Sequence, residues 1–165
     1  MRAVIQRVSQ AQVTIDGQQI AAIDKGLLVL LAAGKGDTPK EVAWMAEKIP
    51  NLRIFPDQND KMNRSLLDLQ AAMIVVSQFT LYGDCRKGRR PSFVHALEPQ
   101  SAEKLCDMFI QKIKALGISC QTGKFGANMM VSLTNDGPVT LLVDSAVSRR
   151  QSAKCFANGQ VPGLT

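Results

Sequence analysis

The sequence predicts an α+β fold of mixed, largely antiparallel sheets with two main helices. Strand patterns fill the first 31 residues, two amphipathic helical stripes come later, and strand patterns return before residue 144. The chain of 165 residues is long enough for one hydrophobic core. We therefore expect one domain over residues 1–144, followed by a basic polar tail over residues 145–165.

The strand patterns at the start of the chain predict a hairpin and a central strand. Ala3–Val8 and Gln12–Ile15 read as strands, and Asp16-Gly17 has the composition of a type I′ turn leading into Gln18–Ile23. Leu27–Leu31 is apolar on both faces, which is typical of a strand covered on both sides.

Two helices are predicted from caps and apolar spacing. Thr38, Pro39 and Glu41 form a capping box with proline at the first helical position, and Pro50 ends this helix. Its apolar stripe consists of Val42, Met45, Ala46 and Ile49. A second helix of about 17 residues precedes Gly117, which suits the left-handed residue after a helix. Its stripe consists of Leu105, Cys106, Phe109 and Ile113.

Further strands are expected at Leu52–Phe55 and Ala72–Val76. Two more, at Met129–Leu133 and Val139–Val143, are predicted to be joined by a turn at Asn135–Pro138. A sheet of this kind has edges that must be covered, and pairing two copies of the chain would cover them.

Bulk composition limits the class of protein. The net charge of +6 favours a polyanionic partner. The apolar stretch Leu27–Ala33 is far shorter than the roughly 20 residues of a membrane helix, and Met1–Val8 lacks a signal-peptide pattern. We therefore expect a cytoplasmic protein that does not bind membranes. Four well-separated cysteines and a single histidine, His95, predict reduced thiols, no metal site and no cofactor.

Polar residues continue the most hydrophobic strand pattern. After Ala72–Val76 come Ser77, Gln78, Phe79 and Thr80, and strand alternation predicts that Gln78 and Thr80 share one face. No histidine is near in sequence, which disfavours a serine-protease-like triad. The structural alternative is a strand running into solvent. The functional one is a site that holds a reactive carbonyl and stabilises its oxyanion without ionisable groups.

A basic loop follows this polar segment. Arg86, Lys87, Arg89 and Arg90 place four positive charges within a few residues of the strand end. The loop is either a solvated turn or a site that binds phosphate groups of a nucleic-acid backbone.

The Gly137-Pro138 pair also has two interpretations. Glycine before proline indicates a turn. A cis peptide bond there would aim successive carbonyl oxygens in similar directions, and two such oxygens in a pocket would select one handedness at a carbon centre.

Five segments together resemble the D-aminoacyl-tRNA deacylase family. They are Met1–Val8, Asn51–Phe55, Val76–Leu81, Arg86–Phe93 and Asn135–Thr140. The resemblance spans Met1 to about Asp144. It implies a homodimer with active sites at the subunit interface, which cleaves the ester between a D-amino acid, or glycine, and the 3′-terminal adenosine of tRNA.

The resemblance also assigns residues. Ser77, Gln78, Phe79 and Thr80 match the family's pocket motif, and Gly137 and Pro138 match a Gly-cisPro motif that the partner subunit inserts to exclude L-amino acids. Arg7 matches an arginine that braces that motif. Met129 and Phe125 correspond to pocket-lining positions, with Phe125 near the terminal adenine. Arg86, Lys87, Arg89 and Arg90 are our candidates for tRNA binding.

The resemblance suggests how hydrolysis could proceed without a protein base. An aminoacyl ester is already activated, so positioning and oxyanion stabilisation suffice for attack by water, and the 2′-hydroxyl of the substrate is thought to assist. Thr80 as a nucleophile is the less favoured alternative. Two other classes remain: a nucleic-acid-binding module without hydrolysis, and a small-molecule esterase, which the missing triad disfavours.

Overall fold

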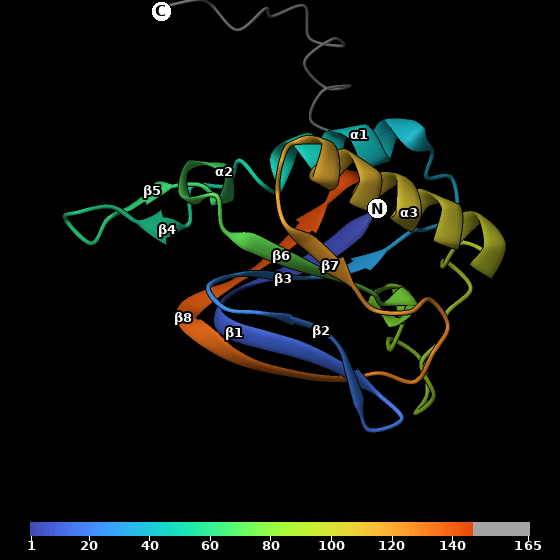
Figure 1. Ribbon diagram of the computed structural model, residues 1–165. Helices are drawn as coiled ribbons and strands as arrows, with labels where there is room; N and C mark the ends of the chain where they lie inside the picture. Colours follow the sequence, from blue (N-terminus) through green and yellow to red (C-terminus); the bar gives the residue numbers. More distant parts are fainter. Residues whose placement is uncertain (147–165) are drawn as a thin grey trace, which may run out of the picture.

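The computed structural model describes residues 1–146. The predicted tail lies outside the described residues apart from Ser145 and Ala146, and Ser145 is buried. The strands are β1 (Arg2–Ile15), β2 (Gln18–Ile23), β3 (Gly26–Ala32), β4 (Phe55–Pro56), β5 (Met62–Arg64), β6 (Ala72–Ser77), β7 (Cys120–Thr122) and β8 (Met130–Asp144). The helices are α1 (Pro39–Lys48), α2 (Leu66–Leu69), α3 (Pro99–Ala115) and the short 3-10 helix η1 (Phe79–Tyr82), as Figure 1 shows.

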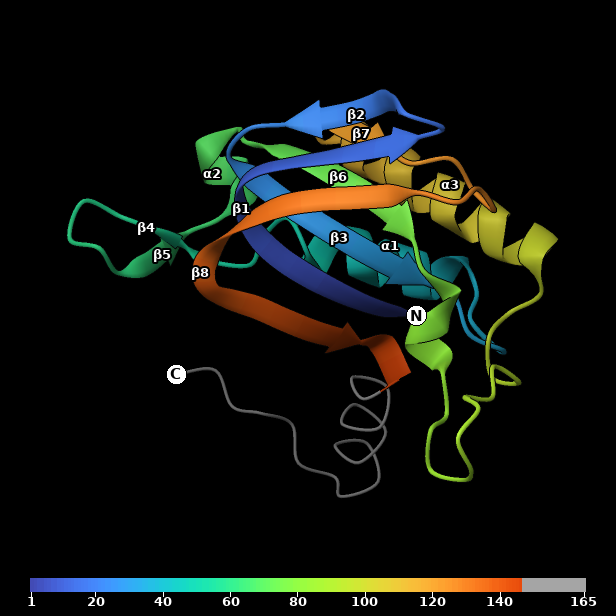
Figure 2. The ribbon, with the colours of Figure 1, turned by 90° about the horizontal axis from the view of Figure 1, so that it is seen from below.

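The long strand β1 organises the sheet. Its first half pairs antiparallel with β3, and its second half pairs antiparallel with β2. β8 follows the other edge of β1 along almost its whole length, from Asp144 opposite Arg2 to Met130 opposite Thr14. Both long strands bend at the same place, so that the sheet curls over itself (Figure 2).

The rest of the sheet is parallel. β3 pairs with β6, and β6 pairs with β7, which makes the sheet mixed as predicted. Gly26 is needed at the start of β3, because a Cβ atom there would lie 2.0 Å from the carbonyl oxygen of Ala72. The side-chain amide of Gln121 exchanges two hydrogen bonds with the backbone of Ala22 and so links β7 to β2 across the curl.

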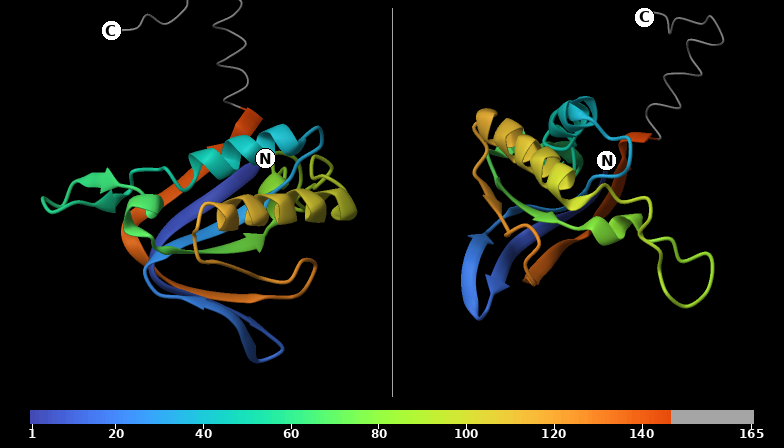
Figure 3. Two further views of the ribbon diagram at one scale, coloured as in Figure 1. Left: turned by 45° about the horizontal axis from the view of Figure 1, so that its top comes forward. Right: turned by 90° about the vertical axis from the view of Figure 1, so that its right-hand side faces the viewer.

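The two main helices cover one face of the sheet. α1 and α3 pack beside each other over β3 and β6, as the two views in Figure 3 show. Their apolar stripes include Met45, Ile49, Phe109 and Ile113, which are fully buried together with Ile5. The second half of β1, with β2 and the first half of β8, covers the other face of β3 and β6 and encloses a smaller core around Leu28 and Ile74.

Several local predictions are confirmed. The backbone at Asp16 and Gly17 has positive φ angles of 49° and 78°, as a type I′ turn requires. The capping box of Thr38 and Glu41 is present at α1, and Gly117 follows α3 with a φ of 81°. The residue that caps α3 is Glu98, whose carboxylate accepts two backbone N–H groups.

Two predicted strand breaks are wrong. Arg2–Ile15 is one strand, because β8 pairs with it on both sides of the bend and the register shifts between Gln6 and Gln10 absorb the bend. The predicted turn at Asn135–Pro138 is likewise part of one strand, β8. The side chain of Asn135 donates to the carbonyls of Arg7 and Val139, and it bridges the gap that the shift leaves in the ladder.

The predicted continuation of the strand through Gln78 and Thr80 is also wrong. β6 stops at Ser77, and Gln78 turns the chain into η1 with a φ of −144° and a ψ of 74°. The strand loses its neighbours at this point, because β7 pairs only as far as Val75 and β3 only as far as Ser77. None of the helices over residues 1–146 is long and apolar enough to span a bilayer.

Candidate functional site

The polar segment after β6 lies at the end of the sheet where β3 also finishes. The backbone N–H of Gln78 donates to the carbonyl of Leu31 at 2.8 Å, which fixes the first residue beyond the strand. The side-chain amide of Gln78 donates to the hydroxyl of Thr80. Strand alternation does not apply in η1, so this contact, and not a shared strand face, brings the two polar side chains together.

A pocket of about 330 Å³ opens beside this segment. Five of the residues assigned from the sequence line it: Ser77, Gln78, Phe79, Phe125 and Met129. The other walls come from the end of β3, from α3 and from the loop before β8. These additional lining residues include Leu31, Ala33, Ala102, Cys106 and Asn128.

The additional wall residues carry no signal in the sequence. Ala102 and Cys106 belong to the apolar face of α3 and look like ordinary core positions, since both are more than nine-tenths buried. Only the packing of α3 against the end of β3 reveals that they also border a pocket. Nothing in their residue type could have shown this beforehand.

Met129 is held over the pocket by a close approach to Gly123. A Cβ atom on Gly123 would lie 2.3 Å from the sulfur of Met129. A larger residue at position 123 would therefore push this side chain away from its present place.

The pocket offers no ionised group for catalysis. Among its lining residues, all within residues 1–146, the only titratable side chain is Cys106. Burial, with the nearby carboxylates of Asp107 and Glu103, raises the pKa of the Cys106 thiol to about 12, so it stays neutral at physiological pH. Across the same described residues, no group of histidine, cysteine or acidic side chains could hold a metal ion. His95 is exposed and does not line the pocket.

Thr80 and the Gly137-Pro138 pair are not among the lining residues. Thr80 is exposed at the outer side of η1. The peptide bond between Gly137 and Pro138 is cis, and both residues are exposed at the bend of β8. Figure 2 shows this bend at the opposite end of the sheet from η1.

The separation follows from the register of the sheet. Arg7, beside the bend, pairs with Leu27, whereas Gln78 bonds to Leu31 at the other end of β3. Four residues of extended strand at about 3.3 Å each separate the two levels by about 13 Å along β3. Gly137 and Gln78 of one chain are therefore far apart.

Arg7 holds the backbone around the bend. Its side chain is buried and donates to the carbonyls of Asp136 at 3.0 Å, Gly137 at 3.4 Å and Ile54. It also forms an ion pair of 3.0 Å with the carboxylate of Asp136. These contacts fix the carbonyl oxygens of Asp136 and Gly137.

The basic loop projects from the body of the protein between η1 and α3 (Figure 3, right). Two backbone hydrogen bonds between Asp84 and Ser92 close it at its base. Arg86 is occupied by a bidentate contact with Asp84, which lowers the pKa of that carboxyl below its ordinary value. Lys87, Arg89 and Arg90 of this loop are exposed and form no ion pair within residues 1–146.

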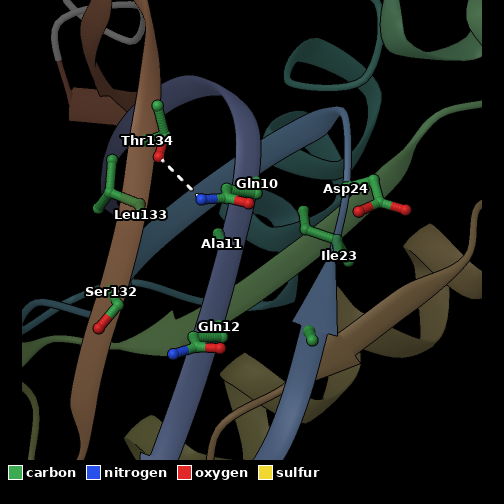
Figure 4. A pocket seen from close by; sticks show the side chains of 9 residues that line it. Gln10, Ala11, Gln12, Ile23, Asp24, Ser132, Leu133 and Thr134 are labelled. Carbon is green, nitrogen blue, oxygen red and sulfur yellow. Dashed lines mark hydrogen bonds between the residues drawn. The ribbon is translucent and has the colours of Figure 1, made fainter.

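A second hollow, of about 410 Å³, lies on the outer face of β1, β2 and β8 (Figure 4). Its polar lining includes Gln10, Gln12, Asp24 and Thr134, and Gln10 donates to the hydroxyl of Thr134 at 3.2 Å. None of the residues assigned from the sequence lines it. We therefore place the candidate site in the pocket beside η1, although that pocket is smaller.

The model of the family described as D-Tyr-tRNA(Tyr) deacylase matches residues 4–144. The chain belongs to the D-aminoacyl-tRNA deacylase family. It is 60% identical over 145 residues to a D-aminoacyl-tRNA deacylase of Desulfatibacillum aliphaticivorans, covering 88% of this chain and 99% of that protein. It is 57% identical over 148 residues to the D-aminoacyl-tRNA deacylase of Clostridioides difficile strain 630, covering 90% and 99% of the two chains.

Two solved structures share the fold of this chain. A c-Myc DNA unwinding element binding protein superposes with a TM-score of 0.82 at 41% identity, over 87% of this chain and 98% of its own. A probable eukaryotic D-amino acid tRNA deacylase superposes with a TM-score of 0.73 at 16% identity, over the same shares, and supports the fold alone. The family resemblance noted in the sequence is thus confirmed.

Proposed function

We propose that this protein hydrolyses the ester between a D-amino acid, or glycine, and the 3′-terminal adenosine of tRNA, and that it rejects L-aminoacyl-tRNA. The observation that carries the proposal is the pocket beside η1, which gathers Ser77, Gln78 and Phe79 without an ionised nucleophile or base. Such a site suits an ester that is already activated. The curated relatives named above are D-aminoacyl-tRNA deacylases.

The chemistry needs position more than reactivity. The aminoacyl ester would lie along η1, with hydroxyl, amide and backbone N–H groups near its carbonyl to stabilise the oxyanion when water attacks. The 2′-hydroxyl of the terminal ribose would assist. Thr80 has a positioning role here, because its hydroxyl already accepts the amide of Gln78 and no base lies among the lining residues.

Chiral selection requires a second copy of the chain. The carbonyls held by Arg7 lie about 13 Å along β3 from the level of Gln78, so they cannot act on the pocket of their own chain. A two-fold interface would bring Gly137 and Pro138 of one subunit to the pocket of the other. Rigid oxygens there would collide with the side chain of an L-amino acid but not with glycine.

The surface around the pocket suits such an interface. Phe79, Met130 and Leu142 are 57%, 74% and 69% exposed, which is unusual for large apolar side chains. Along the same face of β1 and β8, Gln6 faces Thr140 and Gln10 faces Thr134, so these outward pairs are uncharged, and the charges of Arg2 and Asp144 at the end of the face pair with each other. Depletion of charge is typical of the centre of a protein interface.

The tRNA itself would be held through phosphates. Lys87, Arg89 and Arg90 are exposed on the loop between η1 and α3, two elements that border the pocket, and can neutralise backbone charge without reading bases. Arg86 would contribute less, because Asp84 already pairs with it. Because its substrate is charged tRNA, the proposed place of action is the cytoplasm, in translation quality control, with no membrane, metal or cofactor.

One observation favours a second function. The similar structure of 41% identity is that of a DNA unwinding element binding protein. The similarity to that protein is consistent with a nucleic-acid-binding module that uses the basic loop and performs no hydrolysis.

One assay separates these functions. The protein is incubated with D-tyrosyl-tRNA and with L-tyrosyl-tRNA, and ester loss is followed. Release of only the D-amino acid supports the deacylase. Retained tRNA binding with no release supports the binding module, and equal loss of both esters would contradict chiral selection.

A further inference from the structure

The carboxyl end of η1 is held by a buried polar cluster outside the pocket. The carboxylate of Asp37 is 3% exposed and lies 2.7 Å from the amino group of Met1. One of its oxygens accepts the backbone N–H of Gly34 at 2.7 Å and the hydroxyl of Tyr82 at 3.2 Å. Met1 also donates to the hydroxyl of the buried Ser145.

Arg2 holds the same end of η1 from another side. Its guanidinium lies 4.6 Å from the centre of the Tyr82 ring, and it donates to the carbonyl of Leu81 at 3.1 Å. An ion pair of 2.9 Å with Asp144 orients it. We call Asp37, Tyr82 and Arg2 the η1 clamp.

The clamp is built around the tyrosine. Gly34 leaves space for the ring, since a Cβ atom there would lie 2.4 Å from it. Burial, reinforced by Asp37, raises the pKa of Tyr82 far above its ordinary value. The hydroxyl is therefore protonated throughout the physiological range and serves as a hydrogen-bond donor to Asp37.

The position of the pocket residues depends on both ends of η1. The helix is one turn long and has no side-chain cap at Gln78. A single turn has little stability of its own, so its placement comes from tertiary contacts. These include the bond from Gln78 to Leu31 at the start, the ring contact of Phe79 with Phe93 and the η1 clamp at the end.

We propose that Asp37, Tyr82 and Arg2 are positioning residues for deacylation, which act through η1 on Gln78 and Thr80. This inference rests on the proposed function. None of the three lines the pocket, so the effect is indirect. A displacement of about 1 Å in a catalytic group can reduce turnover by about a hundredfold.

The test uses Tyr82→Phe and Asp37→Asn, which keep the shape of each side chain. We expect kcat on D-tyrosyl-tRNA to fall by about tenfold or more in each variant, with KM within about twofold of the wild type. Because the contact between Tyr82 and Asp37 is weakened in either single variant, the double variant should be little worse than the worse single variant.

Glu41→Gln is the matched control. Glu41 is a buried carboxylate close to Asp37 in sequence, but it accepts from Thr38 in the capping box of α1. It should lower Tm to a similar extent and leave kcat unchanged. If Tyr82→Phe and Asp37→Asn reduce kcat no more than Glu41→Gln at an equal loss of Tm, the proposal is overturned.

A measurement without substrate keeps this inference separate from the proposed function. Amide hydrogen exchange in residues 78–83 should be faster in Tyr82→Phe and Asp37→Asn than in the wild type or Glu41→Gln. Unchanged exchange there would refute the clamp. A wild type that fails to hydrolyse D-tyrosyl-tRNA would instead refute the proposed function, and the exchange data would still decide the inference.

Discussion

At the scale of single residues, Arg7 illustrates how one buried side chain serves both stability and the proposed chemistry. Its guanidinium is 7% exposed and donates to three backbone carbonyls. An arginine can do this because its donors are spread in a planar fork, which a lysine lacks. The same hydrogen bonds that satisfy a buried charge therefore fix Asp136 and Gly137.

Replacing Arg7 should affect both properties. In Arg7→Met the three carbonyls lose their donor, and we expect a loss of about 2–4 kcal/mol in the free energy of unfolding. Rejection of L-tyrosyl-tRNA should weaken as well. Urea denaturation and the deacylation assay measure the two effects. Arg53→Met, which removes an exposed arginine bonded to Asn63, is the control and should change neither.

Thr80 tests whether the protein supplies a nucleophile. Because its hydroxyl accepts the amide of Gln78 and no base lies in the pocket, Thr80→Ala should retain activity within about tenfold of the wild type. Single-turnover deacylation of D-tyrosyl-tRNA measures this. Complete loss, together with an acyl-enzyme trapped in the wild type by acid quench, would make Thr80 the nucleophile.

At the scale of elements, the basic loop shows how local contacts alter a sequence-based estimate of charge. In the sequence, Arg86, Lys87, Arg89 and Arg90 appear as four equivalent cations. The closed base of the loop places Asp84 against Arg86, so three of these cations, Lys87, Arg89 and Arg90, form no ion pair within residues 1–146. A carboxylate that accepts a bidentate arginine lowers the positive potential of that loop, which the run of basic letters alone does not indicate.

Removing two of these charges should weaken tRNA binding in a salt-dependent way. In Arg89→Ala/Arg90→Ala, we expect the slope of log binding constant against log salt to decrease by about 1.5 to 2, because about two phosphate contacts are lost. Filter binding over a range of salt concentrations measures it. Arg53→Ala/Arg64→Ala, on the β4–β5 side, should leave the slope unchanged. If the slope does not change when Arg89 and Arg90 are replaced, the loop is a solvated turn that does not bind tRNA phosphates.

At the scale of the whole molecule, the two halves of the proposed site lie at opposite ends of the curled sheet within one subunit. The pocket lies where β3 and β6 finish, and the carbonyls fixed by Arg7 lie at the bend of β8. Only an assembly of two chains can bring them together. Activity and oligomeric state should therefore be coupled.

A charge placed on the outward face of β1 and β8, which we propose as the subunit interface, tests this coupling. Leu142→Glu puts a carboxylate on a side chain that is 69% exposed in one chain, so the fold should tolerate it. Desolvating that charge in an interface is costly, so the proposed dimer should dissociate and lose deacylation. Light scattering after size-exclusion chromatography measures the mass. Ile20→Glu, 44% exposed on β2, is the control. A Leu142→Glu monomer with full chiral selectivity would contradict the cross-subunit site.

The helix caps, the tight turn and the family could all be predicted from the sequence. Caps and turns such as Thr38, Gly117 and Asp16-Gly17 depend on contacts between near neighbours, so their patterns predict them correctly. The paired motifs around Ser77 and Gly137 identified the deacylase family, which the comparison over residues 4–144 confirms.

Tertiary contacts, in contrast, set where the long strands bend, where β6 ends, and which residues form the pocket walls. β1 and β8 are continuous because each is the other's neighbour, and η1 begins where β6 has no further partner. Ala102 and Cys106 reach the pocket through the packing of α3. These features depend on contacts between residues far apart in the chain, and no local pattern encodes such contacts.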